Sequence, residues 1–581
     1  MNSSKTQTSQ HQLRPVALLT WGLGTLLLSS PTLILAQHLP NAGVLERGAE
    51  QGFKVMPTPK LKPQEAAPLE LQAPKEGEVS VVVKRFEIEG NQKLSSDFLR
   101  SKLTHLLGKP LSFAQLKSAS DEVMNAYRQA GWMVRAFLPK QEIEDSLVKL
   151  VIIEGVFGGT QVDGDAPKRI GAERLMRMGN AANTIGEAVR AVKLDRAILL
   201  MDDLPGVMVS GNLVAGEQTG QTNLSIQAVD GPLWDSSLTL DNAGSISTGA
   251  ARLMLNTNLN SPTHWGDLLN ANLLKSEGSN YARLNYSVPV GYMGLRAGVH
   301  ASSLNYSLIG SFSSLGANGT AYTSGVDASY PLIRSQVYNL NVMFNWDHKW
   351  YENQANQSIT SKYQMQVGSW VLSGNALDTF LGGGALNYSL GFTQGHVNLN
   401  DSPNALADAQ TVQTAGHYTK GNFNITRQQT LSPTWSLLLS LNAQKATKNL
   451  DSSEKIYLGG ANAVRAYPSN EGGGSEGQTF TLELRDRLWD VWTLAGFYDY
   501  GHVTVYRNNQ DILGGPLSVQ NAFSLRGAGL SVAWQGIPGV DVKLSVARRI
   551  LDNPIANPKT LADSDGTLRL NRVWLNANVA F

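Results

Sequence analysis

Residues 572–581 read Arg-Val-Trp-Leu-Asn-Ala-Asn-Val-Ala-Phe, and the alternation in this stretch is the signal that decides the fold. Every second position from Val573 to Phe581 is apolar, while Arg572, Asn576 and Asn578 fall on the opposite face. A strand with one apolar and one polar face is what a barrel needs when lipid surrounds it and water fills it. The stretch therefore predicts a membrane-spanning β-strand.

The same period of two returns along the chain from about residue 224. Arg, Asn and Lys occupy the polar face at strand centres, which favours a membrane barrel over a soluble β-sandwich. Backbone in hydrocarbon must satisfy its own hydrogen bonds, so the sheet has to close. At about 10 residues per strand and about 12 per connection, residues 224–581 predict a transmembrane antiparallel β-barrel of roughly 16 strands. Asp401–Thr414 and Arg507–Ser518 are expected to be extracellular loops. The apolar positions that carry the pattern include Leu253, Leu255, Leu284, Val288, Leu295, Val299, Val542, Leu544 and Val546.

The composition agrees with a weakly charged β-rich protein. The chain has 581 residues and no cysteine, which excludes disulfides, thiol nucleophiles and thiolate metal sites. Lys and Arg number 48 against 47 Asp and Glu, so no strong field indicates nucleic acid as a partner. Charged residues make up 16% of the chain, below the roughly 25% of an ordinary soluble domain.

The first 78 residues predict export and a tether. Lys5 and Arg14 precede the apolar run 16–28, and Ala36 offers a cleavage position, so residues 1–36 are expected to be a signal peptide. The apolar run 16–28 is shorter than the ~20 residues that a transmembrane helix needs. No later apolar run in the sequence is long enough for a transmembrane helix either. Residues 37–78 predict a short helix at about 40–52 and then a proline-rich spacer. A disordered tether is the alternative for the spacer.

Two compact mixed units, residues 79–155 and 156–223, are expected before the barrel. Both are predicted to run strand, helix, helix, strand, strand. A generic α+β adaptor is the alternative for either unit alone. The order and length of the first unit resemble the polypeptide-transport-associated (POTRA) fold, and its sequence resembles the POTRA motifs of two-partner secretion transporters at Phe86, Gly90, Asn91, Tyr127, Gly131, Leu138, Pro139, Gln141, Glu154 and Gly155.

The segment 459–478 resembles the long inward-folded loop of the BamA/TpsB superfamily. The family signature is Val-Arg-Gly-Phe/Tyr, and this chain has Val464, Arg465, Ala466 and Tyr467. The resemblance implies that Arg465 pairs with an acidic residue of the inner barrel wall, at Asp499, and latches the loop there. The chain departs from the family pattern at Ala466, where glycine is usual, and at Ser475, where an aspartate is expected.

A second block resembles the opening strands of two-partner secretion (TpsB) outer-membrane transporters, the haemolysin secretion/activation proteins. It comprises Asp241, Asn242, Gly244, Thr248, Gly249, Arg252 and Asp267. The resemblance implies an outer-membrane translocator whose periplasmic POTRA units bind an unfolded exported partner. This partner would be a TpsA-like protein that folds into a β-helix outside the cell. It also implies that the N-terminal helix and the 459–478 loop plug the resting pore, and that Phe581 is read by the barrel-assembly machinery.

The sequence offers little for other classes of function. The nine histidines show no His-Glu-x-x-His spacing, and Gly472–Gly474 lacks the Lys-Ser/Thr of a phosphate-binding loop. Asp563–Gly566 is expected to be a turn rather than a calcium loop. We therefore predict no enzyme activity, no cofactor, no metal and no nucleic-acid partner. A barrel insertase is the alternative function, and a passive porin would need no POTRA units.

Overall fold

The computed structural model describes residues 40–53, 80–141, 143, 145–218, 220–509, 520–557 and 559–581. The predicted signal peptide and the proline-rich spacer lie outside the described residues. The helix expected at about 40–52 is α1 (Ala42–Phe53).

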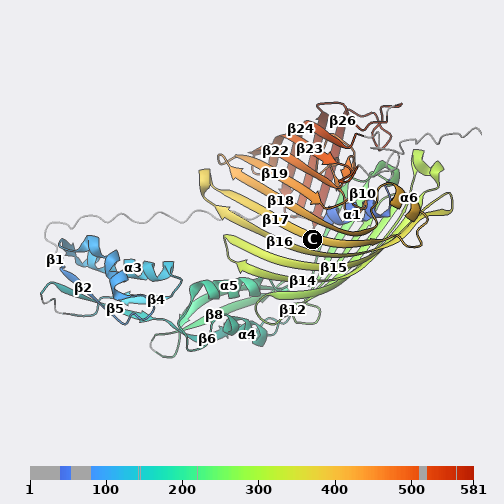
Figure 1. Ribbon diagram of the computed structural model, residues 1–581. Coiled ribbons are helices and arrows are strands. Elements are labelled where there is room, and N and C mark those ends of the chain that lie inside the picture. Colours follow the sequence, from blue (N-terminus) through green and yellow to red (C-terminus); the bar gives the residue numbers. More distant parts are fainter. Residues whose placement is uncertain are drawn as a thin grey trace, which may run out of the picture. The chain divides into compact units, whose positions relative to one another are not determined.

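The C-terminal part is a closed antiparallel barrel of 16 strands, which confirms the predicted fold class (Figure 1). Neighbours in sequence pair throughout, and β26 closes the ring on β9 with Asn576 opposite Asp241 and Ala580 opposite Ser237. The strands are β9 (Trp234–Asp241), β10 (Arg252–Asn260), β11 (Leu268–Lys275), β12 (Ser279–Val290), β13 (Leu295–Ser307), β14 (Asn318–Arg334), β15 (Tyr338–Ala355), β16 (Ser358–Asp378), β17 (Gly384–Asn398), β18 (Gly416–Thr430), β19 (Trp435–Ala446), β22 (Glu476–Leu488), β23 (Trp492–Thr504), β24 (Ala522–Ile537), β25 (Val540–Arg549) and β26 (Asn571–Ala580).

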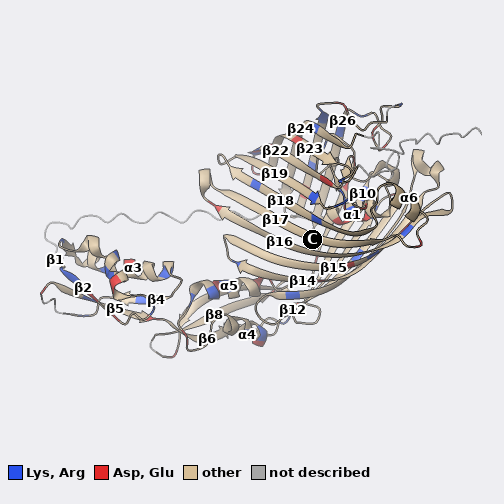
Figure 2. Ribbon diagram, in the orientation of Figure 1, with Lys and Arg blue, Asp and Glu red and all other residues tan. Residues whose placement is uncertain are grey.

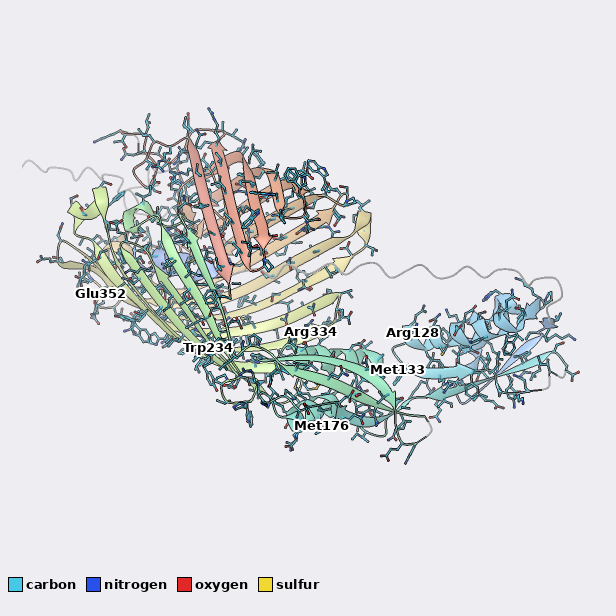
Figure 3. The ribbon with its side chains drawn as sticks, turned by 180° about the vertical axis from the view of Figure 1, so that it is seen from behind. Arg128, Met133, Met176, Trp234, Arg334 and Glu352 are labelled. Carbon is cyan, nitrogen blue, oxygen red and sulfur yellow. The ribbon has the colours of Figure 1, made fainter. Side chains whose placement is uncertain are left out.

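The alternation read from the sequence decides which side chains face out. Leu284, Leu530 and Val573 are exposed to 56%, 70% and 52% on the outer face. Figure 2 shows that most of the barrel ribbon is uncharged. A spanning strand needs about 9–11 residues, so β14, β15 and β16, with 17, 18 and 21 residues, extend beyond a bilayer. Figure 3 labels Arg334 and Glu352, which mark opposite ends of the β14–β15 pair.

The first N-terminal unit is a small sheet covered by helices. Its sheet has the order β2-β5-β4, with β2 parallel to β5 and β4 antiparallel to it. Ser112 begins the long helix α3 with a capping box shared with Gln115, which satisfies two backbone donors at the helix start. The elements are β1 (Ser80–Val82), β2 (Arg85–Glu89), α2 (Ser96–Lys102), η1 (Thr104–Leu106), β3 (Pro110–Ser112), α3 (Phe113–Gln129), β4 (Val134–Phe137) and β5 (Leu147–Glu154).

The second unit repeats this order but ends later than expected. Its elements are β6 (Val156–Val162), α4 (Ala172–Ala182), α5 (Ala191–Asp202), β7 (Val207–Ala215) and β8 (Gln221–Asp230), and the sheet order is β6-β8-β7. The predicted boundary between residues 223 and 224 falls inside β8, so the barrel begins at Trp234 instead. The reason is that Leu224, Ile226 and Ala228 are buried in this unit's core, and a half-buried soluble strand alternates as a barrel strand does.

The remaining elements lie in connections between barrel strands. They are η2 (Ile246–Thr248), η3 (Gly310–Leu315), η4 (Phe380–Gly382), α6 (Ala405–Gln410), β20 (Ile456–Tyr457) and β21 (Gly473–Gly474). The predicted loop Asp401–Thr414 contains α6, and part of the loop Arg507–Ser518 lies outside the described residues. None of the helices in the described ranges is long and apolar enough to cross a membrane.

Candidate functional site

The loop between β19 and β22 brings Arg465 onto the inner wall of the barrel. Its Nε and Nη2 donate to Asp499 Oδ2 and Oδ1 at 2.8 and 2.9 Å, and its backbone N–H donates to Oδ2 at 3.1 Å. Both residues are buried, with Asp499 fully enclosed. The two residues paired in the sequence analysis are therefore in contact, in the bidentate geometry that a guanidinium makes with a carboxylate.

A second carboxylate completes the site, and the sequence analysis missed it. Arg465 Nη1 donates to Glu483 Oε2 at 2.8 Å, and its guanidinium carbon lies 3.3 Å from the centre of the Phe497 ring. Glu483 is two residues from Thr481, which pairs in register with Asp499. The period of two therefore puts Glu483 on the inner face, and this was the signal that could have identified it.

The two departures from the family signature both fit the local packing. Ala466 has no positive φ, so its backbone does not require glycine. Its methyl group packs on Gly527, where an added Cβ would lie 2.5 Å from the Ala466 Cβ. Ser475 donates through Oγ to the Val505 oxygen at 3.1 Å and accepts from the Leu450 N–H at 3.0 Å.

The connection from 550 to 570 holds the other side of the loop. Tyr467 is fully buried and its hydroxyl donates to the Leu551 oxygen at 3.2 Å. Glu471 accepts from Asn553 Nδ2 at 2.7 Å and from the Ser564 backbone at 3.1 Å. All four residues of the signature, Val464 to Tyr467, are thus enclosed between the barrel wall and this connection.

Helix α1 lies inside the barrel, and Glu46 is its main polar anchor (Figure 1). Glu46 is 1% exposed. Its carboxylate accepts from Thr323 Oγ1 and the Tyr351 hydroxyl at 2.7 Å each, and from Ser302 Oγ at 3.2 Å. These three donors come from β14, β15 and β13. A buried carboxylate needs such donors because an unpaired buried charge is costly.

Further contacts hold α1 from both sides. Glu50 forms an ion pair with Arg283 of β12 at 3.2 Å. On the opposite side Asn41 donates to Ser452 Oγ at 2.8 Å, and Gly43 packs so closely that an added Cβ would lie 2.9 Å from the Ser453 Cβ. The helix therefore fills space between the β12–β15 wall and the chain leading into the 459–478 loop.

Part of the barrel-start block closes the ring of strands. Arg252 Nε and Nη2 donate to Asp241 at 2.8 and 2.9 Å. The side chain of Asn242 donates to the Val573 oxygen and accepts from the Leu575 N–H, both at 2.9 Å. Asn242 thereby extends the short β9–β26 pairing by one side-chain rung. Phe581 is 73% exposed, and its backbone exchanges two hydrogen bonds of 2.9 Å with Ser236.

The other members of the block shape connections, and they do not form one cluster. Gly249 has φ +101°, and an added Cβ would lie 2.8 Å from the Glu277 nitrogen, so glycine is required there. At Gly244 the added atom would lie 2.3 Å from the Gly249 oxygen. The Thr248 oxygen accepts from Gly278 at 2.8 Å. Asp267 lies at the other end of these strands and accepts from the Tyr286 hydroxyl at 2.9 Å.

Glu154 organises the predicted POTRA motif. Its Oε1 accepts from the Tyr127 hydroxyl at 2.9 Å and from the backbone of Gln92 and Lys93 at 2.7 Å each. Burial, with the bond to Glu154, raises the pKa of Tyr127 well above its ordinary value. Gly90 has φ +85° and an added Cβ would lie 2.1 Å from the Ile152 oxygen.

The other motif residues also support this small domain. Gln141 pairs through its amide with both backbone groups of Lys149, at 2.8 and 2.9 Å. Asn91 donates to the Leu94 oxygen at 2.7 Å, and the Gly155 N–H donates to the Met133 oxygen at 3.0 Å. Phe86 is buried, and Leu138 packs on the same core. Gly131 follows the end of α3 with φ +81°, and the Pro139 oxygen accepts a hydrogen bond from Gln141. The motif thus holds the fold of the first unit together.

Comparisons with known proteins match this architecture. The sequence pattern of the family described as haemolysin secretion/activation protein ShlB/FhaC/HecB matches residues 220–529, and that of the ShlB-type POTRA domain matches residues 81–155. The chain is 28% identical over 536 residues to the heme/hemopexin transporter protein HuxB of Haemophilus influenzae strain 86-028NP, covering 90% of this chain and 94% of that one. It is 21% identical to the outer membrane transporter CdiB of Dickeya dadantii, over 72% of this chain and 76% of that one.

Solved structures share the fold at low identity. CdiB from Escherichia coli superposes with a TM-score of 0.66 at 17% identity, covering 89% of this chain and 94% of that chain. BamA from Haemophilus ducreyi without POTRA domains 1–3 gives a TM-score of 0.52 at 14% identity, covering 86% and 100%.

Proposed function

Since this chain belongs to the haemolysin secretion/activation protein family of ShlB, FhaC and HecB, it is an outer-membrane transporter of two-partner secretion, and we propose how its parts carry out that transport. The family's POTRA domains are periplasmic, so the first unit faces the periplasm. The family is one of transporters, and we propose no catalytic step for this chain. Membership also favours secretion over barrel assembly, because the likeness to BamA is one of fold alone.

The position of α1 inside the barrel lumen is the observation on which the proposed mechanism rests. A helix held by Glu46 and Glu50 against β12–β15 obstructs the path through the barrel. In our proposal this is the resting state, and the proline-rich spacer predicted within residues 37–78 lets α1 leave when a partner arrives. The 459–478 loop is the second part of the plug, and Arg465 with Asp499 and Glu483 is its latch.

The two N-terminal units, which we take as POTRA domains over residues 79–155 and from 156 to the end of β8, receive the partner. They would bind an unfolded exported polypeptide by adding it as a strand to an exposed sheet edge or by burying its apolar side chains. The partner would then pass through the barrel and fold outside as a β-helix, which biases movement outward without ATP. Insertion of the transporter itself would depend on the barrel-assembly machinery, with Phe581 and β26 as its signal.

The test is secretion of a candidate partner, a large exported protein from the same genome. It is co-expressed with the transporter, without it, and with an unrelated 16-strand barrel as the control. Appearance of the partner in the medium only with this chain supports the proposal. A fall in other outer-membrane proteins on depletion, with secretion unchanged, would instead identify a barrel insertase.

A further inference from the structure

The lumen contains a cavity that α1 and the 459–478 loop leave unfilled. Its volume is about 600 Å³, and one side is formed by α1 with the loop from Gly459 onward. The rest of the lining comes from the barrel start, including Thr248, Arg252 and Ser276, and from the barrel wall at β17, β18, β19 and β22. The polar residues of these four strands are Ser389, Asn422, Asn424, Asn442, Gln444 and Thr479, which we call the amide patch.

The amide patch is continuous across four strands and carries no charge. In register, Ser389 lies beside Asn424, Asn424 beside Asn442, and Asn442 beside Thr479. Asn422 donates to Gln444 at 2.9 Å, Asn424 donates to Asn442, and Asn442 donates to Thr479 at 3.3 Å. These bonds link side chains of neighbouring strands into one polar surface.

The patch keeps hydrogen-bonding capacity that the fold does not use. A primary amide has two donors and an acceptor with two lone pairs. Asn424 Oδ1 is enclosed and has no hydrogen-bond partner among the described residues, although its Nδ2 is engaged. A buried acceptor without a partner is unusual in a settled structure. Asn422 and Asn442 line the cavity, and each of their amide nitrogens, which has two N–H groups, donates one hydrogen bond among the described residues. The remaining donors are what a polypeptide in the cavity could contact.

The wall behind α1 has the opposite chemistry. His300 of β13 contacts Asp347 at 2.7 Å and Asp327 at 3.2 Å. The same wall carries Arg283 on β12 and Lys349 on β15. Arg283 has Glu50 of α1 as its partner. When α1 leaves, that wall presents charges that attract or repel a passing side chain according to its sign.

We propose that the amide patch is the surface along which the extended partner polypeptide crosses the lumen. The inference rests on the proposed secretion function and adds the site that the partner contacts. Extended backbone offers an N–H and a C=O at every residue, and amides can pair with both whatever the side chains are. Each such bond replaces one to water, so the net gain is small and the chain can slide.

Site-specific crosslinking tests the placement. A photoreactive residue replaces Asn442 in the full-length transporter, and the partner is stalled by fusion to a disulfide-locked domain. The matched positions are Leu441, the next residue on the outer face, and His300 on the charged wall. Crosslinks to the partner from Asn442 and not from Leu441 or His300 support the proposal. Crosslinks from His300 without any from Asn442 would overturn it.

Substitutions test the role of neutrality. Asn424→Asp with Asn442→Asp keeps side-chain size but adds charge, and we expect secretion to slow roughly tenfold, equivalent to about 1.4 kcal/mol at the limiting step. Asn424→Ser with Asn442→Ser should secrete within about twofold of wild type. Asn270→Asp, in the separate amide ladder of β10–β11, is the matched control.

The outcomes separate this inference from the proposed function. Normal secretion by the double aspartate variant, with the barrel inserted, would overturn the role of the patch and leave the transporter intact. Failure of the unmodified chain to secrete any partner would overturn the transport function itself, and the patch proposal with it.

Discussion

The indole nitrogen of Trp574, on the last strand of the barrel, donates a hydrogen bond of 2.7 Å to the main-chain oxygen of Arg465. This bond joins the 459–478 loop at Arg465 to β26, the strand that closes the barrel by pairing with β9. The 459–478 loop and the closure of the barrel are therefore connected, because Asn242 of the barrel-start block hydrogen-bonds to the backbone of Val573 and Leu575, on either side of Trp574.

Replacing Trp574 by Phe should loosen the loop tip without opening the barrel. The aromatic ring is kept and one hydrogen bond is lost, which costs about 1 kcal/mol. We expect a lower temperature for the heat-induced change in gel migration and faster proteolysis within 459–478. Trp492→Phe is the control, since its ring is 38% exposed on the outer face. Equal shifts in both variants would argue against the bond to Arg465.

Breaking the latch should reduce secretion while the barrel still inserts. Arg465→Ala leaves the buried Asp499 carboxylate without its guanidinium partner, while Glu483 keeps Arg485 at 2.8 Å. Removing one partner of a buried ion pair costs about 3–5 kcal/mol. Asp499→Ala should give a similar defect, and the double variant should be no worse than either single one. Secretion and insertion are measured together, with Arg487→Ala as the control because that side chain is 59% exposed. Multiplying defects in the double variant would show that the two residues act separately.

The methyl group of Ala466 makes a sharper prediction about the loop. Gly527→Ala should displace the loop, since the added Cβ would lie 2.5 Å from the Ala466 Cβ. Ala466→Gly alone should be tolerated, with a loss within about 1 kcal/mol from added chain entropy. The double variant should recover thermal stability and secretion relative to Gly527→Ala. A double variant as impaired as Gly527→Ala would place the clash elsewhere.

Period-two alternation was enough to predict the barrel, because lipid outside and water inside impose it on every strand. The strand number came from the length of the alternating region. It failed at β8, where a small sheet covered by α4 and α5 imposes the same period for another reason. Resemblance then supplied what alternation does not, namely that Arg465 and Asp499 meet across 34 residues of sequence. Alternation along β22 also places Glu483 on the inner face, but the sequence analysis did not identify it as a partner of Arg465.

Glu46 shows what the sequence does not reveal. In the helix 42–53 its spacing places it on the face of Ala42 and Ala49, but nothing local indicates the three hydroxyl groups that bind it. Those donors come from Ser302, Thr323 and Tyr351, more than 250 positions away along the chain. Long-range polar contacts of this kind depend on the barrel being closed around the helix.

The last prediction concerns the plug itself. Glu46→Leu removes every acceptor for three enclosed wall hydroxyls, and hydrogen bonds to a charged group contribute about 1.5–3 kcal/mol each. A loss of only about 1.4 kcal/mol between the docked and released states of α1 raises the released fraction tenfold. We therefore expect the reconstituted variant to conduct at least about tenfold more often than wild type, approaching the level of a variant lacking residues 40–53. Gln51→Ala is the control, because Gln51 lies on the exposed face of the same helix.

If deletion of residues 40–53 left conductance at the wild-type level, α1 would not be the plug. The closed state would then have to come from the 459–478 loop, whose latch variant Arg465→Ala should open the pore.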